Sequence, residues 1–109
     1  MKLILAIVQR DDAGKLVDQL VEKGYRATRI DTAGGFLKAR NASILMGVDD
    51  EQVDEVLAII YDNCKTRTKY VTPIAPLLDI AEASVAYPVE VQVGGATIFV
   101  LNVERFERG

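Results

Sequence analysis

Apolar and polar positions follow two different patterns along the chain, and the difference predicts where strands and helices lie. A strand is expected over residues 2–8, because residues 3–8 are apolar at both odd and even positions, which is typical of a strand with both faces covered. Residues 42–48 have the same character. Further strands are expected over residues 25–32, in a short stretch at 69–72, and over 89–93 and 96–103, with the last two joined as a hairpin through Gly94 and Gly95.

The first helix is predicted between the first two strands. Asp11 and Asp12 are expected to cap its N-terminus, and Gly24 occupies the position at which glycine commonly ends a helix. Its apolar stripe, at the spacing of one helical face, consists of Ala13, Leu16, Val17, Leu20 and Val21.

The second helix is expected to begin after Asp49, which with Gln52 three residues later fits a capping box. We expect Cys64 to be a small core residue at the end of this helix and not a reactive thiol, because free cysteine is commonly buried. The apolar stripe consists of Val53, Val56, Leu57, Ile60 and Cys64.

The order strand–helix–strand–strand–helix–strand predicts an α+β ferredoxin-like βαββαβ sandwich. Its length suits one domain, so residues 1–109 are expected to form a single unit. Periodicity is lost over residues 65–87, where Pro73 and Pro76 interrupt it. We therefore expect a long flexible loop after the second helix, in addition to a shorter one at about 34–41.

An apolar sheet face without a cover is the main physical problem of this prediction. Both helices of a ferredoxin-like sandwich lie on one face of the sheet, yet residues 2–8 and 42–48 are apolar on both faces. The uncovered face would expose a larger apolar patch than monomers usually leave open. We therefore expect a homo-oligomer, and a cyclic trimer is the arrangement that this fold commonly takes.

Composition excludes several classes of function. The chain has a formal net charge of -3 and no histidine, which argues against binding to nucleic acid, triad chemistry and most transition-metal sites. No apolar run approaches the length of a membrane span. The first residues lack the length and cleavage site of a signal peptide, and Cys64 is the single cysteine. A reducing cytoplasm is therefore the expected location.

Positive charge gathers around the glycine pair Gly34–Gly35. A cationic stretch within an acidic chain indicates a small anion as ligand, because nucleic acid needs a broad basic surface. The alternative is a solvated hairpin whose charges only keep a sheet edge soluble. The cations are Lys23, Arg26, Arg29, Lys38 and Arg40, and the neighbouring carboxylates are Glu22 and Asp31.

Four stretches of the chain together form a specific pattern: KLILAIVQ, YRATRIDTAGGFLKARN, GVDDEQVDEVL and YPVEVQVGGATIFVL. They resemble the P-II-like cyclic di-AMP receptor proteins of bacteria, and the similarity extends from residue 2 to about 103. The resemblance implies a ferredoxin-like homotrimer that binds cyclic di-AMP in clefts between neighbouring subunits, with no further cofactor.

The resemblance also implies a set of ligand-binding positions. Two positions depart from the family pattern, because Gly24 stands where some relatives have asparagine, and Arg108 lies near where some offer a glutamine to the base. The matching positions are Arg26, Ala27, Thr28, Gly35, Phe36, Leu37, Asn41 and Gly47, with Phe99 as an aromatic contact from the last strand.

The residue types at these positions suit a ligand with two purines and two negative charges. The guanidinium of Arg26 suits a phosphate, and Phe36 offers a stacking surface. Thr28 and Asn41 carry donors and acceptors for an adenine edge. Alternatives remain for each: a surface ion pair for Arg26, packing against the sheet for Phe36, core packing for Phe99, and a turn cap for Asn41.

No catalytic assembly is visible in the sequence, because the carboxylates gather at helix starts where capping accounts for them. The leading hypothesis is a cytoplasmic signal-transduction receptor for cyclic di-AMP that acts on an unidentified protein partner through ordering of its loops. The alternatives are a trimeric sensor or enzyme for another adenine nucleotide or small anion, and a purely structural trimer.

Overall fold

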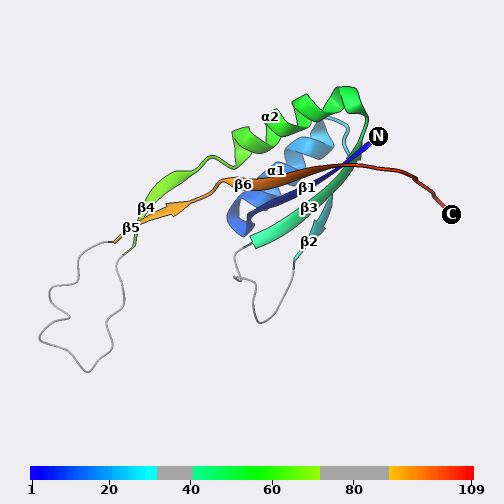
Figure 1. The fold of residues 1–109 in the computed structure, drawn as a ribbon. Coiled ribbons are helices and arrows are strands. Elements are labelled where there is room, and N and C mark those ends of the chain that lie inside the picture. The colour runs from blue at the N-terminus through cyan, green and yellow to red at the C-terminus, as the bar shows by residue number, and fades with distance from the viewer. Residues whose placement is uncertain (32–40, 72–88) are drawn as a thin grey trace, which may run out of the picture.

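The computed structural model describes residues 1–31, 41–71 and 89–109. Figure 1 shows two helices above a sheet, with a two-stranded ribbon that projects from one end of it. In chain order the elements are β1 (Lys2–Gln9), α1 (Arg10–Glu22), β2 (Thr28–Ile30), β3 (Asn41–Val48), the 3-10 turn η1 (Asp50–Gln52), α2 (Val53–Asn63), β4 (Arg67–Val71), β5 (Val89–Val93) and β6 (Ala96–Asn102).

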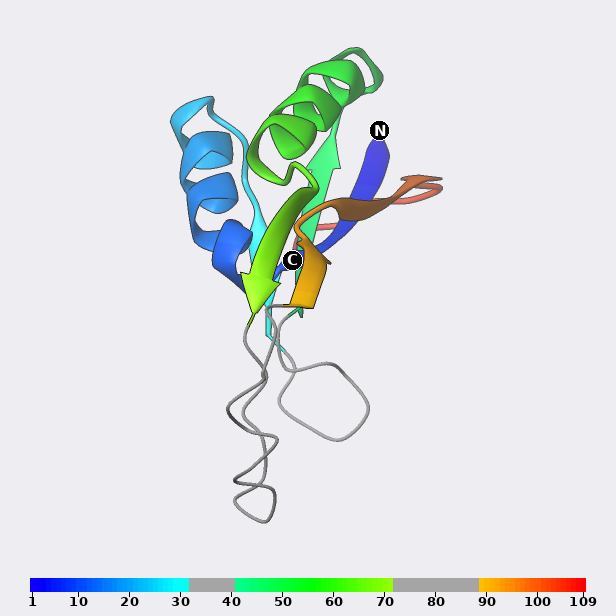
Figure 2. The same cartoon turned by 90° about the vertical axis from the view of Figure 1, so that its left-hand side faces the viewer.

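The main sheet has the strand order β2-β3-β1-β6, and every neighbouring pair is antiparallel. Both helices lie on the same side of it (Figure 2). This is the expected α+β ferredoxin-like arrangement, which the structure confirms. The remaining strands, β4 and β5, pair with each other in a separate two-stranded ribbon.

The core lies between the sheet and the two helices. Along β1, every second residue is buried, because Ile4, Ala6 and Val8 point toward the helices. The corresponding residues of β3 are Ala42, Ile44, Met46 and Val48, and the helices contribute Ala13, Leu16, Leu20, Val56 and Ile60. Each fully buried Leu, Ile, Val or Met side chain contributes about 1.5–3 kcal/mol of stability.

No helix of the described residues covers the opposite face of the sheet. Directly paired residues share a face, so Leu5 lies between Leu45 on β3 and Phe99 on β6. Leu5 and Leu45 are half-buried, and Phe99 is 50% exposed. We call this surface the open face. It also contains Leu3, Ile7, Thr28, Ile30, Ser43, Gly47, Thr97 and Leu101.

The start of α1 differs from the expectation. Strand β1 continues to Gln9, which is the N-cap residue, and the helix follows at once. Asp11 and Asp12 therefore lie in the first turn, and their predicted capping role is wrong. The capping box predicted before the second helix is confirmed: the Asp49 N–H donates to Gln52 Oε1 at 2.9 Å.

The predicted hairpin through Gly94 and Gly95 is also wrong. Strand β5 pairs with β4, whereas β6 pairs with β1, so the glycine pair marks the passage from the ribbon into the main sheet. Both glycines have positive φ, 86° and 81°, which a side chain would strain. A Cβ on Gly94 would collide with the carbonyl oxygen of Lys65.

The ribbon is anchored at its base by an ion pair. Nη2 of Arg67 lies 3.0 Å from Oδ1 of Asp12, and Nη1 donates to Oδ2 at 3.3 Å and to the Lys65 carbonyl at 3.2 Å. Asp12 is almost buried. This contact raises the pKa of Arg67 above its ordinary value and explains why Asp12 does not act as a cap.

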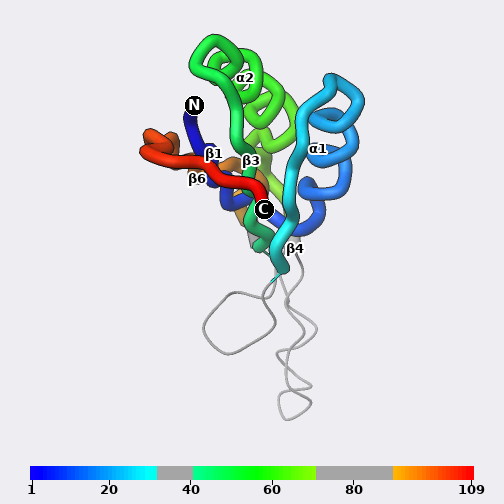
Figure 3. Tube along the Cα trace, turned by 90° about the vertical axis from the view of Figure 1, so that its right-hand side faces the viewer, coloured from blue at the N-terminus to red at the C-terminus, as the bar shows by residue number. Residues whose placement is uncertain are grey.

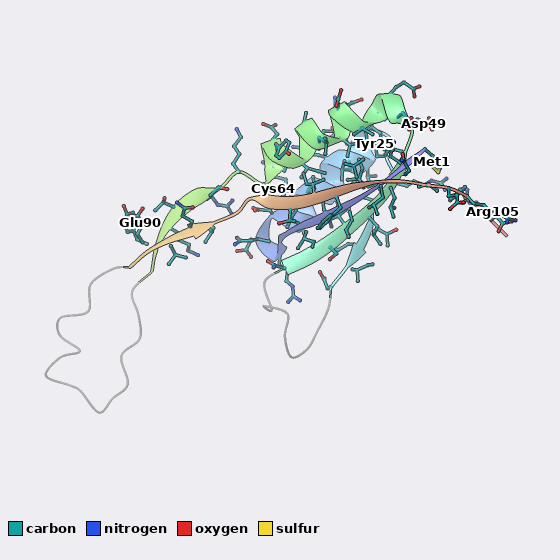
Figure 4. The ribbon with its side chains drawn as sticks, in the orientation of Figure 1. Met1, Tyr25, Asp49, Cys64, Glu90 and Arg105 are labelled. Atoms are coloured by element: carbon teal, nitrogen blue, oxygen red, sulfur yellow. The ribbon has the colours of Figure 1, made fainter. Side chains whose placement is uncertain are left out.

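Cys64 lies beside this ion pair and is 2% exposed, as expected for a core residue (Figure 4). Burial, and the nearby Asp12 carboxylate, raise the pKa of its thiol to about 11. The thiol is therefore protonated at neutral pH and is chemically inert. Its carbonyl accepts the Gly95 N–H at 2.6 Å, which completes the junction between α2 and β6.

Two strand boundaries differ from those expected. The strand predicted over residues 25–32 is regular only from Thr28 to Ile30. The short strand predicted at 69–72 is confirmed as β4, which begins two residues earlier and ends at Val71, within the segment predicted as a long loop. Residues 34–40 and 72–87, where the two flexible loops were predicted, otherwise lie outside the described residues. Within the described ranges, neither helix is long and apolar enough to cross a membrane, and no cluster of three metal-ligating side chains occurs.

Candidate ligand-binding site

A groove of about 310 Å3 lies on the open face at the end of the sheet where the chain begins. Three of the predicted ligand-binding residues line it: Arg26, Thr28 and Gly47. They come from the segment before β2, from β2 itself and from the end of β3. The groove is completed by Met1, Leu3, Leu45, Met46 and Phe106. We call it the Arg26 groove.

Strand register explains why residues distant in sequence meet in this groove. Thr28 pairs with Leu45, and Gly47 pairs with Leu3, so all four lie on the same face of the sheet. Arg26 precedes β2 by two residues and is exposed. Within the described ranges, no carboxylate forms an ion pair with it, so its five donors face the groove or solvent.

Gly47 keeps the groove open. Its φ is not in the left-handed region, and a Cβ at this position would meet only Met1 Cε, at 3.9 Å. The packing of one chain therefore does not require a glycine here. The missing side chain instead allows another group to approach the backbone of β3 closely.

Tyr25 holds the segment that carries Arg26. Gly24, with φ of 91°, ends α1, and the Tyr25 N–H then donates to the Leu20 carbonyl at 2.9 Å. The buried Tyr25 side chain donates its hydroxyl proton to Glu55 Oε2 on α2 at 2.8 Å (Figure 4). This hydrogen bond and burial raise the pKa of Tyr25 above 10.0. The tyrosine thus links the groove to the helical layer.

We expect Tyr25→Phe to lower the free energy of unfolding by about 1 kcal/mol, the value of a typical hydrogen bond, and to weaken ligand binding in the Arg26 groove. Because the folded-state pKa is raised, the contribution is present below pH 10.0 and is lost as the pH rises through the folded-state value. Urea unfolding of both proteins at pH 7 measures it. Equal midpoints would show that the hydroxyl contributes nothing.

Asn41 lies at the opposite end of β3 from Gly47. Six residue steps separate them, which correspond to roughly 20 Å of strand. Asn41 lines a second groove of about 310 Å3, at the base of the ribbon, together with Gln9, Gly94 and Gly95. Ile7, Val8, Ala96 and Thr97 complete this Asn41 groove. One chain therefore does not bring Asn41 together with Arg26.

The remaining residues that were predicted to bind the ligand lie outside both grooves or outside the described residues. Ala27 is half-buried against the core, so its side chain is a packing contact. Phe99 lies on the open face between the two grooves and is half exposed, so the core-packing alternative does not describe it. Gly35, Phe36 and Leu37 lie outside the described residues. That any of these positions binds a ligand stays a prediction.

Phe106 is the groove residue that sequence reasoning missed. It belongs to the C-terminal segment Val103–Gly109, which has no regular secondary structure. The available signal was a single aromatic residue within the charged stretch ERFERG, because a phenyl ring flanked by charges has no amphipathic element to bury it.

The chain is similar to one family model over its whole length and to individual proteins over different shares of it. Residues 1–109 match the family model described as "Cyclic-di-AMP receptor". The "Nitrogen fixation nifHD region GlnB-like protein 1" of Methanothermococcus thermolithotrophicus is 35% identical over 79 residues, which cover 61% of this chain and 75% of that protein. The crystal structure of a functionally unknown protein from Pediococcus pentosaceus ATCC 25745 is 44% identical, with a TM-score of 0.74 over 99% of this chain and 96% of the other.

These similarities confirm the resemblance on which the sequence interpretation depended. The match to the family model extends over the structural elements that build both grooves, and the related GlnB-like protein belongs to the P-II-like group. The chain is therefore a member of the cyclic-di-AMP receptor family.

Proposed function

We propose that the protein is a cytoplasmic receptor that binds cyclic di-AMP between the subunits of a homotrimer, carries out no reaction, and passes the signal to a protein partner. One observation carries the proposal: within a chain that matches the cyclic-di-AMP receptor family throughout, Arg26, Thr28 and Gly47 line a single groove on the open face.

The position of the two grooves supports a site shared between copies. The Arg26 groove and the Asn41 groove lie at opposite ends of the open face, and Phe99 lies between them. If copies pack head to tail through this face, the Arg26 groove of one protomer meets the Asn41 groove of the next. Head-to-tail contacts close into rings when the rotation allows it, and a trimer is the ring expected for this fold.

The chemistry of the two grooves matches the ligand. Cyclic di-AMP carries two phosphates and two adenines. Arg26 offers a planar fork of donors for a phosphate, and Thr28 and Asn41 offer the polar groups for base edges. Charge-assisted contacts contribute about 1.5–3 kcal/mol each. Together with base stacking, they reach the ~8 kcal/mol of a micromolar complex after the cost of ordering.

In this proposal, ligand binding changes the ribbon formed by β4 and β5, and the partner protein recognises that change. The base of the ribbon is one wall of the Asn41 groove, because Gly94 and Gly95 line that groove and connect β5 to β6. A ligand seated there would contact the junction that sets the direction of the ribbon. The ordering of residues 34–40 and 72–87 on binding belongs to this proposal.

A thermal-shift panel tests the ligand. Cyclic di-AMP, cyclic di-GMP, ATP and AMP are added at equal concentration, and only a ligand that binds the folded state raises the Tm. We expect cyclic di-AMP alone to raise the Tm. In a separate measurement, light scattering should give three times the mass of the 12.0 kDa chain. Stabilisation by ATP or AMP alone would favour a sensor or enzyme for another adenine nucleotide. A flat panel would favour a purely structural assembly.

A further inference from the structure

The C-terminal segment returns to the end of the sheet where the chain begins. After β6, the Val103 N–H donates to the Met1 carbonyl at 3.2 Å. Figure 3 shows the tail passing in front of β3 toward β2. In Figure 4, Met1 and Arg105 both lie at the end of the molecule opposite to Glu90 on the ribbon. This path brings Phe106 to the Arg26 groove.

Core packing against the described part of the chain does not account for the position of Phe106. It is 64% exposed, whereas an aromatic ring used for core packing would be covered. Its neighbours Arg105 and Glu107 pair with each other at 2.8 Å on the surface, so the segment between them is polar. The ring nevertheless lines a groove with Arg26, Thr28 and Gly47.

We propose that Phe106 is a stacking surface for one adenine of the bound ligand. The proposal deepens the function proposed above and rests on it. The groove combines a guanidinium for phosphate, a hydroxyl for a base edge, and a backbone without a side chain at Gly47. An exposed aromatic ring supplies the flat apolar surface that a purine needs and that the aliphatic lining, Leu3 and Leu45, offers less well.

Two variants of this position test the proposal. We expect Phe106→Ala to weaken cyclic di-AMP binding by about tenfold in calorimetry, because stacking of one base is lost. Phe106→Trp preserves the stacking surface and should retain near wild-type affinity. Because the chain has no tryptophan, its emission reports this position alone, and it should change on addition of cyclic di-AMP with the same midpoint as the calorimetric titration.

The matched control is Tyr61→Ala. Tyr61 is an equally exposed aromatic, at 59%, on the solvent side of α2, and its removal should leave the affinity unchanged. The stacking role would be overturned if Phe106→Ala kept the wild-type affinity, or if the Phe106→Trp emission did not change at saturating ligand. Either result would leave the proposed function in place. Loss of the trimer in Phe106→Ala would overturn it too, by assigning the ring to subunit contact. Absence of binding by the wild type would remove the proposed function itself.

Discussion

Leu5→Glu is expected to convert the proposed homotrimer into a monomer and to abolish the proposed binding of cyclic di-AMP. Leu5 is at the centre of the open face, between Leu45 and Phe99. A carboxylate there would be buried without a partner if copies packed through this face, and burying an unpaired charge costs several kcal/mol. In a monomer the same side chain reaches water, so the fold should persist. Light scattering and calorimetry measure the two effects.

Val21→Glu is the matched control for this substitution. Val21 is 58% exposed on the outer side of α1, so the same change in size and charge falls on a surface that the proposal leaves free. The trimer and the affinity should both be retained. A Leu5→Glu protein that remains trimeric with unchanged affinity would show that the copies do not associate through the open face.

Arg26→Ala is expected to weaken cyclic di-AMP binding by tenfold or more. The guanidinium is the cation of the Arg26 groove and has no carboxylate partner within the described ranges. Its removal therefore takes away a contact with the ligand and leaves the stability of the protein nearly unchanged. Arg26→Lys should recover only part of the affinity, because an ammonium cannot make the two-pronged phosphate contact. Calorimetry at fixed salt concentration compares the three proteins.

Arg29→Ala separates a local contact from a general loss of positive charge. Arg29 lies three residues further along and pairs with Asp31 at 3.1 Å. Its register partner, Ile44, places it on the helix side of the sheet and not on the open face. Affinity should stay near the wild-type value. An equal loss in both alanine variants would mean that the net charge, and not the groove, determines binding.

The elements of the core could be predicted from the sequence because their signals are local. The alternation at Ile4, Ala6 and Val8 and the helical spacing of Val56 and Ile60 each lie within a few residues, and burial against the opposing layer follows from them. The strand order follows from the fold class once the elements are known. The open apolar face could be anticipated for the same reason.

Interactions between distant segments account for what the sequence did not predict. Asp12 is turned from a helix cap into the anchor of the ribbon by Arg67, which lies 55 residues away. The Gly94–Gly95 pair would suit a tight turn, yet β1 and β4 each take one of the flanking strands as partner and keep them apart. No local pattern encodes that competition.

Three residues of the Arg26 groove were predictable from the sequence, and its geometry was not. The family resemblance supplied Arg26, Thr28 and Gly47, and the register of β2, β3 and β1 then brings them into one groove. Asn41 is separated from the Arg26 groove because it lies at the opposite end of β3 from Gly47. The presence of Phe106 in the groove depends on the path of the C-terminal segment after β6. The sequence of that segment has no periodicity from which its path could be predicted.

The way in which the ribbon joins the sheet has an evolutionary consequence. The described contacts that orient it are the Asp12–Arg67 ion pair, the glycine pair and the Gly95–Cys64 hydrogen bond, all at its base. Within the described ribbon, substitutions in β4 and β5 beyond that base can accumulate at little cost to the packed layers. The outer part of β4 and β5 is therefore expected to tolerate changes in sequence that the sheet and the helices would not.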